Sequence, residues 1–368
     1  MLPLSKGGGH RVNKTKNQAH IYGAAVEMSW MDASQSLTDL IFSGVTAALK
    51  DADMTLDAAD SIVLGASDLI DGRSLSSMVT APAAGAYMKD EIRLSEDGLA
   101  AASFGAARIE AGESQVTVVA AWGRASEGDP LAVSRAGTDP FLHQPLCISE
   151  MDVSAFRLSR WLGRYPDSDA SRRAASAERQ RRAAGNPHAL HTVTAPRDVP
   201  YPLREDESCR WGDVVAAMVI GKAPGKIRIS GVGHGTDHAD LGERDLLAMP
   251  ALRDAARLSL DAAGINLSDV GLFEIDGMTL SDEALSAEAV GLCPAGDGFR
   301  ALAERQDINP TGGSEAGWCY PAMGLVRLIE AYQMLRAPQG PDGPRRAMAT
   351  GLGGGGAQTA TAIVLEKT

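Results

Sequence analysis

Two stretches of this sequence repeat one another. Residues 45–65 read VTAALKDADMTLDAADSIVLG, and residues 256–276 read ARLSLDAAGINLSDVGLFEID. Each stretch predicts a helix, a short polar turn and an apolar strand, and the two align without a gap. This repeat restricts the chain to folds that are built from two copies of one α/β half.

The similarity extends beyond the aligned stretches. Each copy follows a short apolar strand and precedes a helix and two further strands. In the first half we place these four elements at 20–23, 98–112, 116–120 and 214–220, and in the second half at 227–231, 324–336, 346–350 and 359–365. Strands that are apolar on both faces and alternate with helices are typical of mainly parallel sheets with helices on either side. We therefore expect an α/β fold with two mixed, mainly parallel sheets.

The two halves differ by one long insertion. Residues 18–222 are expected to form the first half, and residues 223–368 the second. The insertion covers about 124–205 and is rich in Arg and Ala. A long excursion from a compact core is usually functional, for example as a cover over a site. Residues 1–17, with Gly7-Gly8-Gly9 and several charges, are expected to form a loose leader.

Composition narrows the function classes. The net charge of −12 argues against nucleic acid or an anionic membrane as the main partner. No apolar run is long enough for a membrane span, and the N-terminus does not resemble a signal peptide, so a cytoplasmic location is expected. The four cysteines form no CxxC pair, which disfavours a cysteine-based zinc site.

Four short motifs occur in an order that is found in one known family. They are Asn-Pro-Thr-Gly-Gly at 309–313, Gly-Leu-Gly-Gly-Gly-Gly at 351–356, the segment 206–217, and Asn-Pro-His-Ala at 186–189. With the duplicated halves and the insertion, they resemble the thiolase superfamily, in particular its sterol-carrier-protein-x, lipid-transfer-protein-like branch. The resemblance implies a duplicated αβαβα core, a coenzyme A thioester as substrate or ligand, and a homodimer.

The family's catalytic residues do not appear at the positions that match. Where thiolases place a nucleophilic cysteine, this chain reads Leu-Ser-Glu-Asp-Gly, and Ser95 is the nearest match. The Gly-His-Pro histidine aligns with Trp318, which cannot act as a general base. The His-Asp-x-Phe motif corresponds to 274–279, where Asp276 remains without the histidine, and the glycine loop has no cysteine.

Four residues are candidates for chemistry. Tyr320 can donate a proton to an oxyanion, or abstract one if its pKa is lowered, but it can also simply fill the space of the missing histidine. Cys319 is a nucleophile or a small buried apolar residue. Asp276, at a predicted strand end, is a base or a turn residue, and Glu274 beside it is expected to point to solvent. Ser95 lacks the acidity of a thiol, and the neighbouring carboxylates oppose an alkoxide.

Ligand contacts are expected from two regions. The glycines of the 351–356 loop let the backbone approach a ligand and direct N–H groups at an oxyanion; the candidates are Gly353, Gly354 and Gly355, with Gly313 in the other turn. In the insertion, Arg181 and Arg182 are candidate phosphate ligands for coenzyme A, or part of a solvated helix face. His234 and His238 do not have the spacing of a metal site, so no metal is expected.

Three functions remain open. The first is an enzyme that makes or breaks a C–C bond next to an acyl-CoA thioester without an acyl-cysteine, as thiolase-like retro-aldolases do. The second is an acyltransferase that uses Ser95 or Cys319. The third is a non-catalytic subunit that binds acyl-CoA or supports an active partner. The resemblance also implies possible complexes with a small OB-fold, zinc-ribbon protein or with a second thiolase-like chain.

Overall fold

The computed structural model describes residues 17–368 apart from 31–33, 191–198, 223, 339 and 341–342. The expected leader covers 1–17, and its residues 1–16 lie outside the described part. In the first half the elements are β1 (Ala19–Ser29), α1 (Leu37–Asp51), β2 (Ser61–Gly65), α2 (Ser77–Ala83), β3 (Asp90–Leu94), α3 (Gly98–Ala111), β4 (Val116–Arg124) and β5 (Asp213–Lys222). The second half contains β6 (Ile227–Thr236), α7 (Pro250–Ala263), β7 (Phe273–Glu274), α8 (Leu280–Val290), α9 (Gly298–Glu304), α10 (Met323–Arg336), β8 (Arg346–Gly353) and β9 (Thr359–Lys367).

The helix ends follow local sequence. Ser36 and Asp39 form a capping box at the start of α1, where each side chain accepts a hydrogen bond from the other residue's backbone N–H. Gly112 ends α3 and Gly264 ends α7 with a left-handed backbone, which glycine adopts at little cost. These signals fix the elements locally and allow the α/β pattern to be read from sequence.

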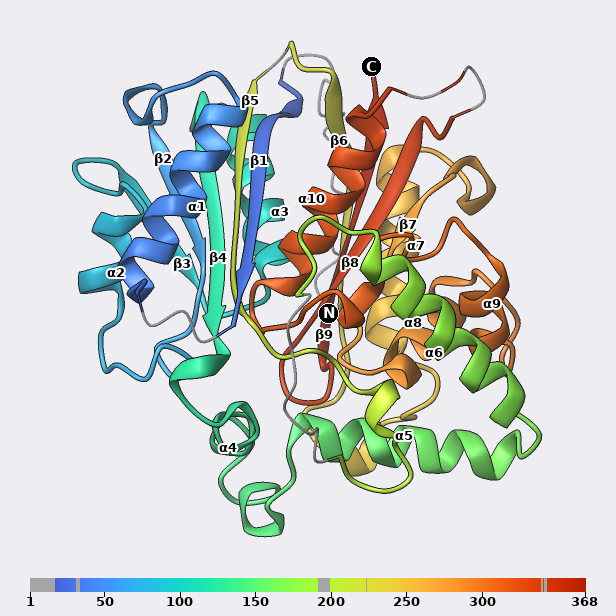
Figure 1. Cartoon of the computed structure of the whole chain (residues 1–368). Helices are drawn as coiled ribbons and strands as arrows, with labels where there is room; N and C mark the ends of the chain where they lie inside the picture. Colours follow the sequence, from blue (N-terminus) through green and yellow to red (C-terminus); the bar gives the residue numbers. More distant parts are fainter. Residues whose placement is uncertain (1–16, 31–33, 191–198, 223, 339, 341–342) are drawn as a thin grey trace, which may run out of the picture.

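The strands form one mixed sheet in the order β3-β2-β4-β5-β1-β6-β9-β8-β7. Counted outward from the point where the halves meet, the second half repeats the strand order of the first. Strands β6, β9, β8 and β7 take the places of β1, β5, β4 and β2. The two halves meet where β1 and β6 pair through only two residue pairs, His20–Arg228 and Ile21–Ile227. Figure 1 shows the halves side by side, with α10 between them.

The expected α/β class is confirmed, but two details of the sheet are wrong. The halves join into one sheet instead of two, since β1 and β6 pair at their ends. The described ladders are also mainly antiparallel: only β2–β3, β2–β4 and β7–β8 are parallel. The reason is that the last strand of each half, β5 or β9, returns in the opposite direction into the middle of its half.

Helices cover both faces of the sheet, which explains why the strands are apolar throughout. Along β4, Val118, Ala120 and Trp122 pack in one cluster with α1, whereas Val119 and Ala121 pack in the other cluster with α3. The side chains alternate in this way because successive residues of a strand point to opposite faces. Parallel and antiparallel strands show the same continuous apolar pattern when helices lie on both faces of the sheet. The sequence could therefore not distinguish the two strand directions.

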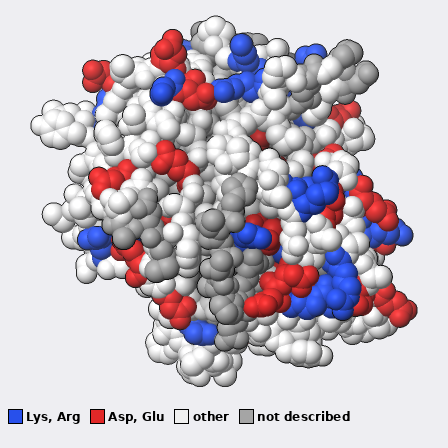
Figure 2. Space-filling view, viewed as in Figure 1, with Lys and Arg blue, Asp and Glu red and all other residues white. Residues whose placement is uncertain are grey.

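The segment between β4 and β5 contains three longer helices: α4 (Pro130–Ala136), α5 (Glu150–Arg164) and α6 (Asp169–Ala184). In Figure 1, α4 lies below the first half, whereas α5 and α6 extend across the second half. The segment therefore spans both halves. On the face shown in Figure 2, acidic and basic side chains are mixed, so this face presents no broad basic surface.

Candidate active site

A cavity of about 800 Å³ opens beside the ends of several strands. Its walls come from the loops that follow β2, β3, β4 and β7, the loop before α10, the turn between β8 and β9, and the starts of α4 and α5. The C-terminal ends of parallel strands commonly gather functional groups in this way. The volume lies within the range of small-molecule sites.

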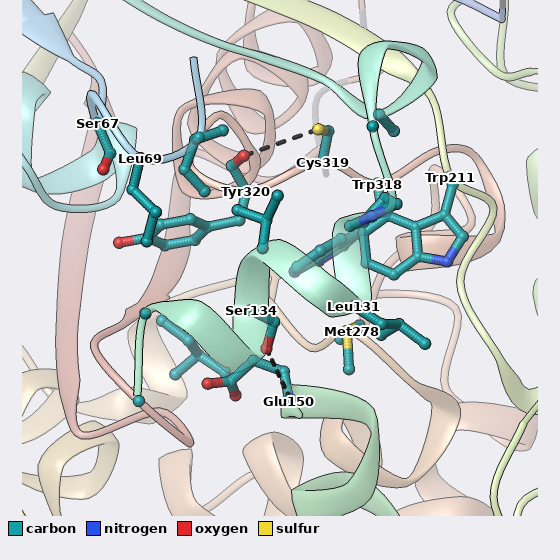
Figure 3. A pocket seen from close by; sticks show the side chains of 18 of the residues that line it. Ser67, Leu69, Leu131, Ser134, Glu150, Trp211, Met278, Trp318, Cys319 and Tyr320 are labelled. Carbon is teal, nitrogen blue, oxygen red and sulfur yellow. Dashed lines mark hydrogen bonds between the residues drawn. The ribbon is translucent and has the colours of Figure 1, made fainter. Parts of the chain in front are cut away.

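The four predicted catalytic residues all lie in this cavity wall. Ser95, Asp276, Cys319 and Tyr320 come from three separate segments, and the fold brings them together. Figure 3 shows the Tyr320 ring extending toward Leu69, with Trp318 and Trp211 on the other side of the cavity. Their shared location agrees with the sequence analysis, while their roles stay predictions.

Asp276 follows β7 and is 3% exposed. Its Oδ2 accepts a hydrogen bond from the backbone N–H of Leu352 at 3.1 Å, and its Oδ1 accepts one from Gly277 at 2.9 Å. Burial raises the pKa of Asp276 to about 6, although Arg327 and the two N–H groups oppose the shift. A carboxylate with this pKa can accept a proton near neutral pH.

Tyr320 lies in the loop before α10. Burial raises the pKa of its phenol above the usual range, and the carboxylates Glu96, Asp97 and Glu150 raise it further. The Gly354 backbone offsets part of this shift. The phenol is therefore protonated at neutral pH, which suits a hydrogen-bond or proton donor and not a base.

Cys319 and Ser95 lack the surroundings of activated nucleophiles. Burial raises the pKa of the Cys319 thiol, and the charge of Asp213 adds to this effect, so the thiol is protonated at neutral pH. Its Sγ lies 3.7 Å from the Tyr320 carbonyl oxygen, which can accept its hydrogen. Ser95 is exposed and lies outside α3, which begins at Gly98.

Asp97 was missed by the sequence analysis. It caps α3, where its Oδ1 accepts from Leu99 N at 2.8 Å and its Oδ2 accepts from Gly324 N at 2.9 Å. A Cβ on Gly324 would lie only 1.9 Å from its Oδ1, and one on Gly351 only 2.2 Å, so both positions need glycine. The sequence signal that could have identified Asp97 is its position immediately before a Gly- and Ala-rich helix, because aspartate is a common N-cap residue.

Asp97 and Asp276 form a coupled pair of carboxyl groups. The pKa of Asp97 is raised well above its usual value, first by burial and then by the charge of Asp276, with Glu96 contributing less. Because like charges repel, the ionised form of Asp276 favours the protonated form of Asp97.

The glycine loop is held from three sides. Glu150, at the start of α5, accepts the Gly356 N–H at 2.7 Å, and the Nη2 of Arg157 donates to the Gly356 carbonyl at 2.7 Å. Arg244 donates through Nη1 to the carbonyls of Gly355, at 2.7 Å, and Gly356, at 3.0 Å. Sequence reasoning missed these three side chains, because only tertiary packing brings them to the loop.

The position that aligns with the thiolase histidine carries an aromatic pair. The rings of Trp318 and Trp211 lie edge to face with centroids 5.1 Å apart. Trp318 is 9% exposed, and both rings line the cavity opposite Tyr320 (Figure 3). The pair provides an apolar surface where the family places an acid–base group.

Only some of the predicted ligand-binding glycines lie in the cavity wall. Gly354 and Gly355 line the cavity, whereas Gly353 and Gly313 are not among its lining residues. Gly313 instead leaves room for Glu283, since a Cβ there would lie 2.4 Å from Glu283 Oε1.

Arg181 and Arg182 lie outside the cavity wall. Both pair with Glu178, at 2.6 Å and 2.9 Å, and Arg182 also donates to the carbonyls of Ile308 and Arg305. Phosphate binding by these arginines stays a prediction, and the helix face is only partly solvated, because Arg182 is 7% exposed.

Glu274 does not point to solvent, so that expectation is wrong. The residue is fully buried, and its Oε2 accepts a hydrogen bond from Thr311 at 2.9 Å and lies 3.2 Å from Arg327 Nη1. Burial, together with the nearby Glu330, raises its pKa to about 8, although Arg327 and Thr311 oppose the shift. Glu274 therefore belongs to the internal contacts of the 309–313 turn.

Neither a metal-binding cluster nor a membrane-spanning helix is found in the described part of the chain. Within the described part of the chain, no group of three or more His, Cys, Asp and Glu side chains could hold a metal ion. The ring of His234 instead contacts Ser103 at 3.1 Å and Thr361 at 3.0 Å. None of the helices described is long and apolar enough to cross a membrane.

Comparisons with known proteins agree with this architecture. The family described as Thiolase C-terminal domain-like matches residues 233–367. Sterol carrier protein 2 of Rattus norvegicus is 36% identical over 121 residues, and that of Homo sapiens is 33% identical over 121 residues. Each match covers 30% of this chain and 22% of the relative, so the chain matches about a fifth of the length of these curated relatives.

Solved structures resemble nearly the whole chain. One, described as an Ltp2-ChsH2(DUF35) aldolase, superposes with a TM-score of 0.79 at 19% identity and covers 95% of this chain and 98% of its own. Another, a monomeric SCP2-thiolase-like protein type 1 from Mycobacterium smegmatis, has a TM-score of 0.72 at 19% identity, covering 95% of this chain and 77% of its own.

The family match places residues 233–367 with the thiolase C-terminal domain, and the solved structures show a thiolase-like fold for nearly the whole chain. The partial matches to sterol carrier protein 2 support a likeness to that branch of the thiolases.

Proposed function

We propose that this protein cleaves or forms a C–C bond next to an acyl-CoA thioester, by retro-aldol-type chemistry and without an acyl-enzyme. The observation that carries the proposal is the pair of Asp276 and Tyr320 in one cavity wall, with a carboxyl pKa of about 6 and a protonated phenol. A cavity that places a base and a hydrogen-bond donor beside a glycine turn is suited to enolate chemistry.

In the cleavage direction, the Asp276 carboxylate removes the proton of a β-hydroxyl group. The bond between C2 and C3 breaks, C3 becomes the carbonyl of an aldehyde or ketone, and the electron pair passes into a thioester enolate. The Tyr320 hydroxyl donates a hydrogen bond to the enolate oxygen. The proton on Asp276 returns to C2, which gives the shortened acyl thioester and leaves both side chains unchanged.

The test is product analysis with β-hydroxyacyl-CoA compounds of increasing length. The proposal expects an aldehyde or ketone and a shortened acyl-CoA in equal amounts. Asp276→Asn and Tyr320→Phe should each lower the rate by roughly 10² to 10⁴, the usual contribution of positioned acid–base groups. Full activity in both variants would remove these assignments.

Acyl transfer is a weaker proposal for this cavity. It needs a thiolate or an alkoxide, whereas the thiol of Cys319 is held protonated and Ser95 is exposed and lies outside helix α3. An acyl adduct after incubation with acetyl-CoA would favour it.

A non-catalytic subunit is the second candidate. The observation that favours it is that the similar aldolase structure is described by two components, Ltp2 and ChsH2(DUF35). A small OB-fold, zinc-ribbon protein or a second thiolase-like chain would then be the partner of this chain. Copurification with such a protein, without turnover by the isolated chain, would support this candidate over the enzyme.

We also propose a homodimer, in keeping with the superfamily. Strand β3 lies at the edge of the sheet, and Met78, Tyr87 and Met88 near it are 76%, 82% and 88% exposed. An unpaired strand beside exposed apolar side chains can pair with a second copy. Light scattering of the purified chain should give twice the chain mass.

A further inference from the structure

Charged side chains in the cavity wall are mostly acidic. Five carboxylic acids line it, and three arginines do so: Asp71, Glu127, Glu150, Asp276 and Asp282, with Arg73, Arg124 and Arg157. The wall is therefore net negative unless several of the acids hold protons. A charged end group of a ligand would therefore interact with the negative charge of the wall.

Two of the arginines are already paired with carboxylates of the protein. Arg124 lies 3.0 Å from Glu127 and 3.5 Å from Asp213. Arg157 lies 3.0 Å from Asp282, and it also donates to the Gly356 carbonyl. Their charge is thus largely balanced within the wall. Arg73 is exposed, and solvent weakens its attraction for a ligand group.

Two of the acids are held by backbone N–H groups. Asp276 accepts from Leu352 and Gly277, and Glu150 accepts from Gly356. Neither forms an ion pair within 4.0 Å with another described residue. Arg327 acts on Asp276, and Arg157 and Arg244 act on Glu150, but all three do so from beyond ion-pair distance, so the negative charge of the two acids is only partly compensated.

The remaining surface of the cavity is largely apolar. Aromatic and aliphatic side chains contribute it from both halves of the chain, namely Leu69, Ile70, Leu131, Val133, Trp211, Met278, Trp318 and Leu352. Figure 3 shows Leu131 and Met278 below the two tryptophans, with Glu150 near them. An apolar chain can be buried here with a favourable free energy of about 25 cal/mol per Å².

We infer that the cavity selects acyl thioesters whose acyl group is uncharged, and that it rejects acyl groups that end in a carboxylate. This inference rests on the proposed acyl-thioester ligand and specifies its class. A terminal carboxylate would lose its hydration without gaining an unpaired buried cation, and it would meet the negative charge of Glu150 in the same wall. Like charges brought together in this way weaken binding. A terminal ammonium group meets no such repulsion.

The test is a binding series with three coenzyme A thioesters of equal length: octanoyl-CoA, 7-carboxyheptanoyl-CoA and 8-aminooctanoyl-CoA. Isothermal titration calorimetry at pH 7.5 measures each affinity. Because the coenzyme A part is the same, the ratios report the end group alone. We expect the carboxylate ligand to bind at least about tenfold more weakly than octanoyl-CoA, and the ammonium ligand to bind within about threefold of it.

A variant links the selectivity to this wall. Glu150→Gln keeps an oxygen for the Gly356 N–H but removes the charge, so it should reduce the tenfold ratio to about threefold or less. The matched control is Glu243→Gln, since Glu243 is exposed and pairs with His238 outside the cavity wall. The control should leave the ratio unchanged.

Three results would overturn the inference. They are equal or tighter binding of the carboxylate ligand, an unchanged ratio in a folded Glu150→Gln protein, and no binding of any of the three thioesters. The wild-type series needs no variant, so a misfolded variant does not decide the outcome. Selective binding without C–C cleavage would contradict the proposed reaction alone, because binding does not depend on turnover.

Discussion

Asp276 and Asp97 lie far apart in the sequence, yet both carboxyl groups are buried and both lie against the end of β8, Asp276 at Leu352 and Asp97 at Gly351. Asp97 stands at the start of α3, close to the place where the superfamily has its nucleophile. A carboxyl group with a raised pKa there cannot attack a thioester as a thiolate does. It can hold a proton and leave the charge on Asp276, which faces the cavity.

The pH dependence of cleavage follows from Asp276. A base works in its ionised form, and with a pKa of about 6 the ionised fraction falls as pH drops through 6. We expect kcat/KM to be flat from about pH 7 to 8 and to decrease about tenfold per pH unit well below 6. A profile measured with a β-hydroxyacyl-CoA checks this, and a constant rate down to pH 4.5 would exclude Asp276 as the base.

Among the elements, the turn between β8 and β9 shows how the insertion and the second half shape the site. Glu150 and Arg157 come from α5, and Arg244 comes from the loop before α7, but all three bond to Gly355 or Gly356. Glycine has many accessible backbone conformations, so these bonds fix a turn that would otherwise be mobile. The arrangement makes Arg244 a positioning residue for Gly354 and Gly355.

Replacing Arg244 with alanine should therefore change the rate more than the affinity. We expect kcat to fall by roughly tenfold or more, because small displacements of a preorganised group are costly, while KM changes about twofold. Arg244→Lys should recover part of the loss, since a lysine keeps the charge but not the forked geometry. Arg253→Ala is the control, because Arg253 is exposed on α7. Equal kcat values in all variants would contradict this role.

Local patterns were sufficient to predict the elements but not the direction of the strands. The helix caps and the apolar runs of β2, β4 and β5 depend on neighbouring residues, so the repeated halves could be predicted. Antiparallel pairing through β5 and β9 depends on where each strand inserts.

For the site, the strand-end position of Asp276 and the loop of Tyr320 were visible in sequence. The roles of Glu150 and Arg244 were not, since they arise from contacts between distant segments.

For the whole molecule, α6 links the insertion to the second half. Its buried arginines do not form a solvated face: Arg172 pairs with Glu207 at 2.6 Å, and Arg179 donates to Ser314 at 3.0 Å and to the carbonyls of Asp206 and Ser208. Their partners lie outside the helix and cannot be identified from the local sequence. For this reason the Arg-rich helix suggested phosphate binding or solvent exposure. Arg179 holds the helix against the second half through Ser314, whereas Arg172 holds it against the segment that returns to β5 in the first half.

Loss of one of these contacts should destabilise the protein. Arg179→Ala removes the donor to the Ser314 hydroxyl and to the carbonyls of Asp206 and Ser208, and it removes a buried positive charge 3.8 Å from Glu283 and Glu315, so we expect the free energy of unfolding to fall by about 3–5 kcal/mol. Arg173→Ala, on the same helix but exposed, should leave the melting temperature unchanged. Denaturant unfolding of both variants measures the difference, and equal stability would refute the anchoring role.

The central claim is that the cavity supports C–C cleavage of a thioester without a covalent intermediate. The most direct test records the intact mass of the protein during turnover of a β-hydroxyacyl-CoA, with the products quantified in the same sample. The account predicts an unmodified protein mass together with equal amounts of a carbonyl product and a shortened acyl-CoA. An acyl adduct on Cys319 or Ser95 that forms and decays with turnover would contradict it, as would the absence of both products.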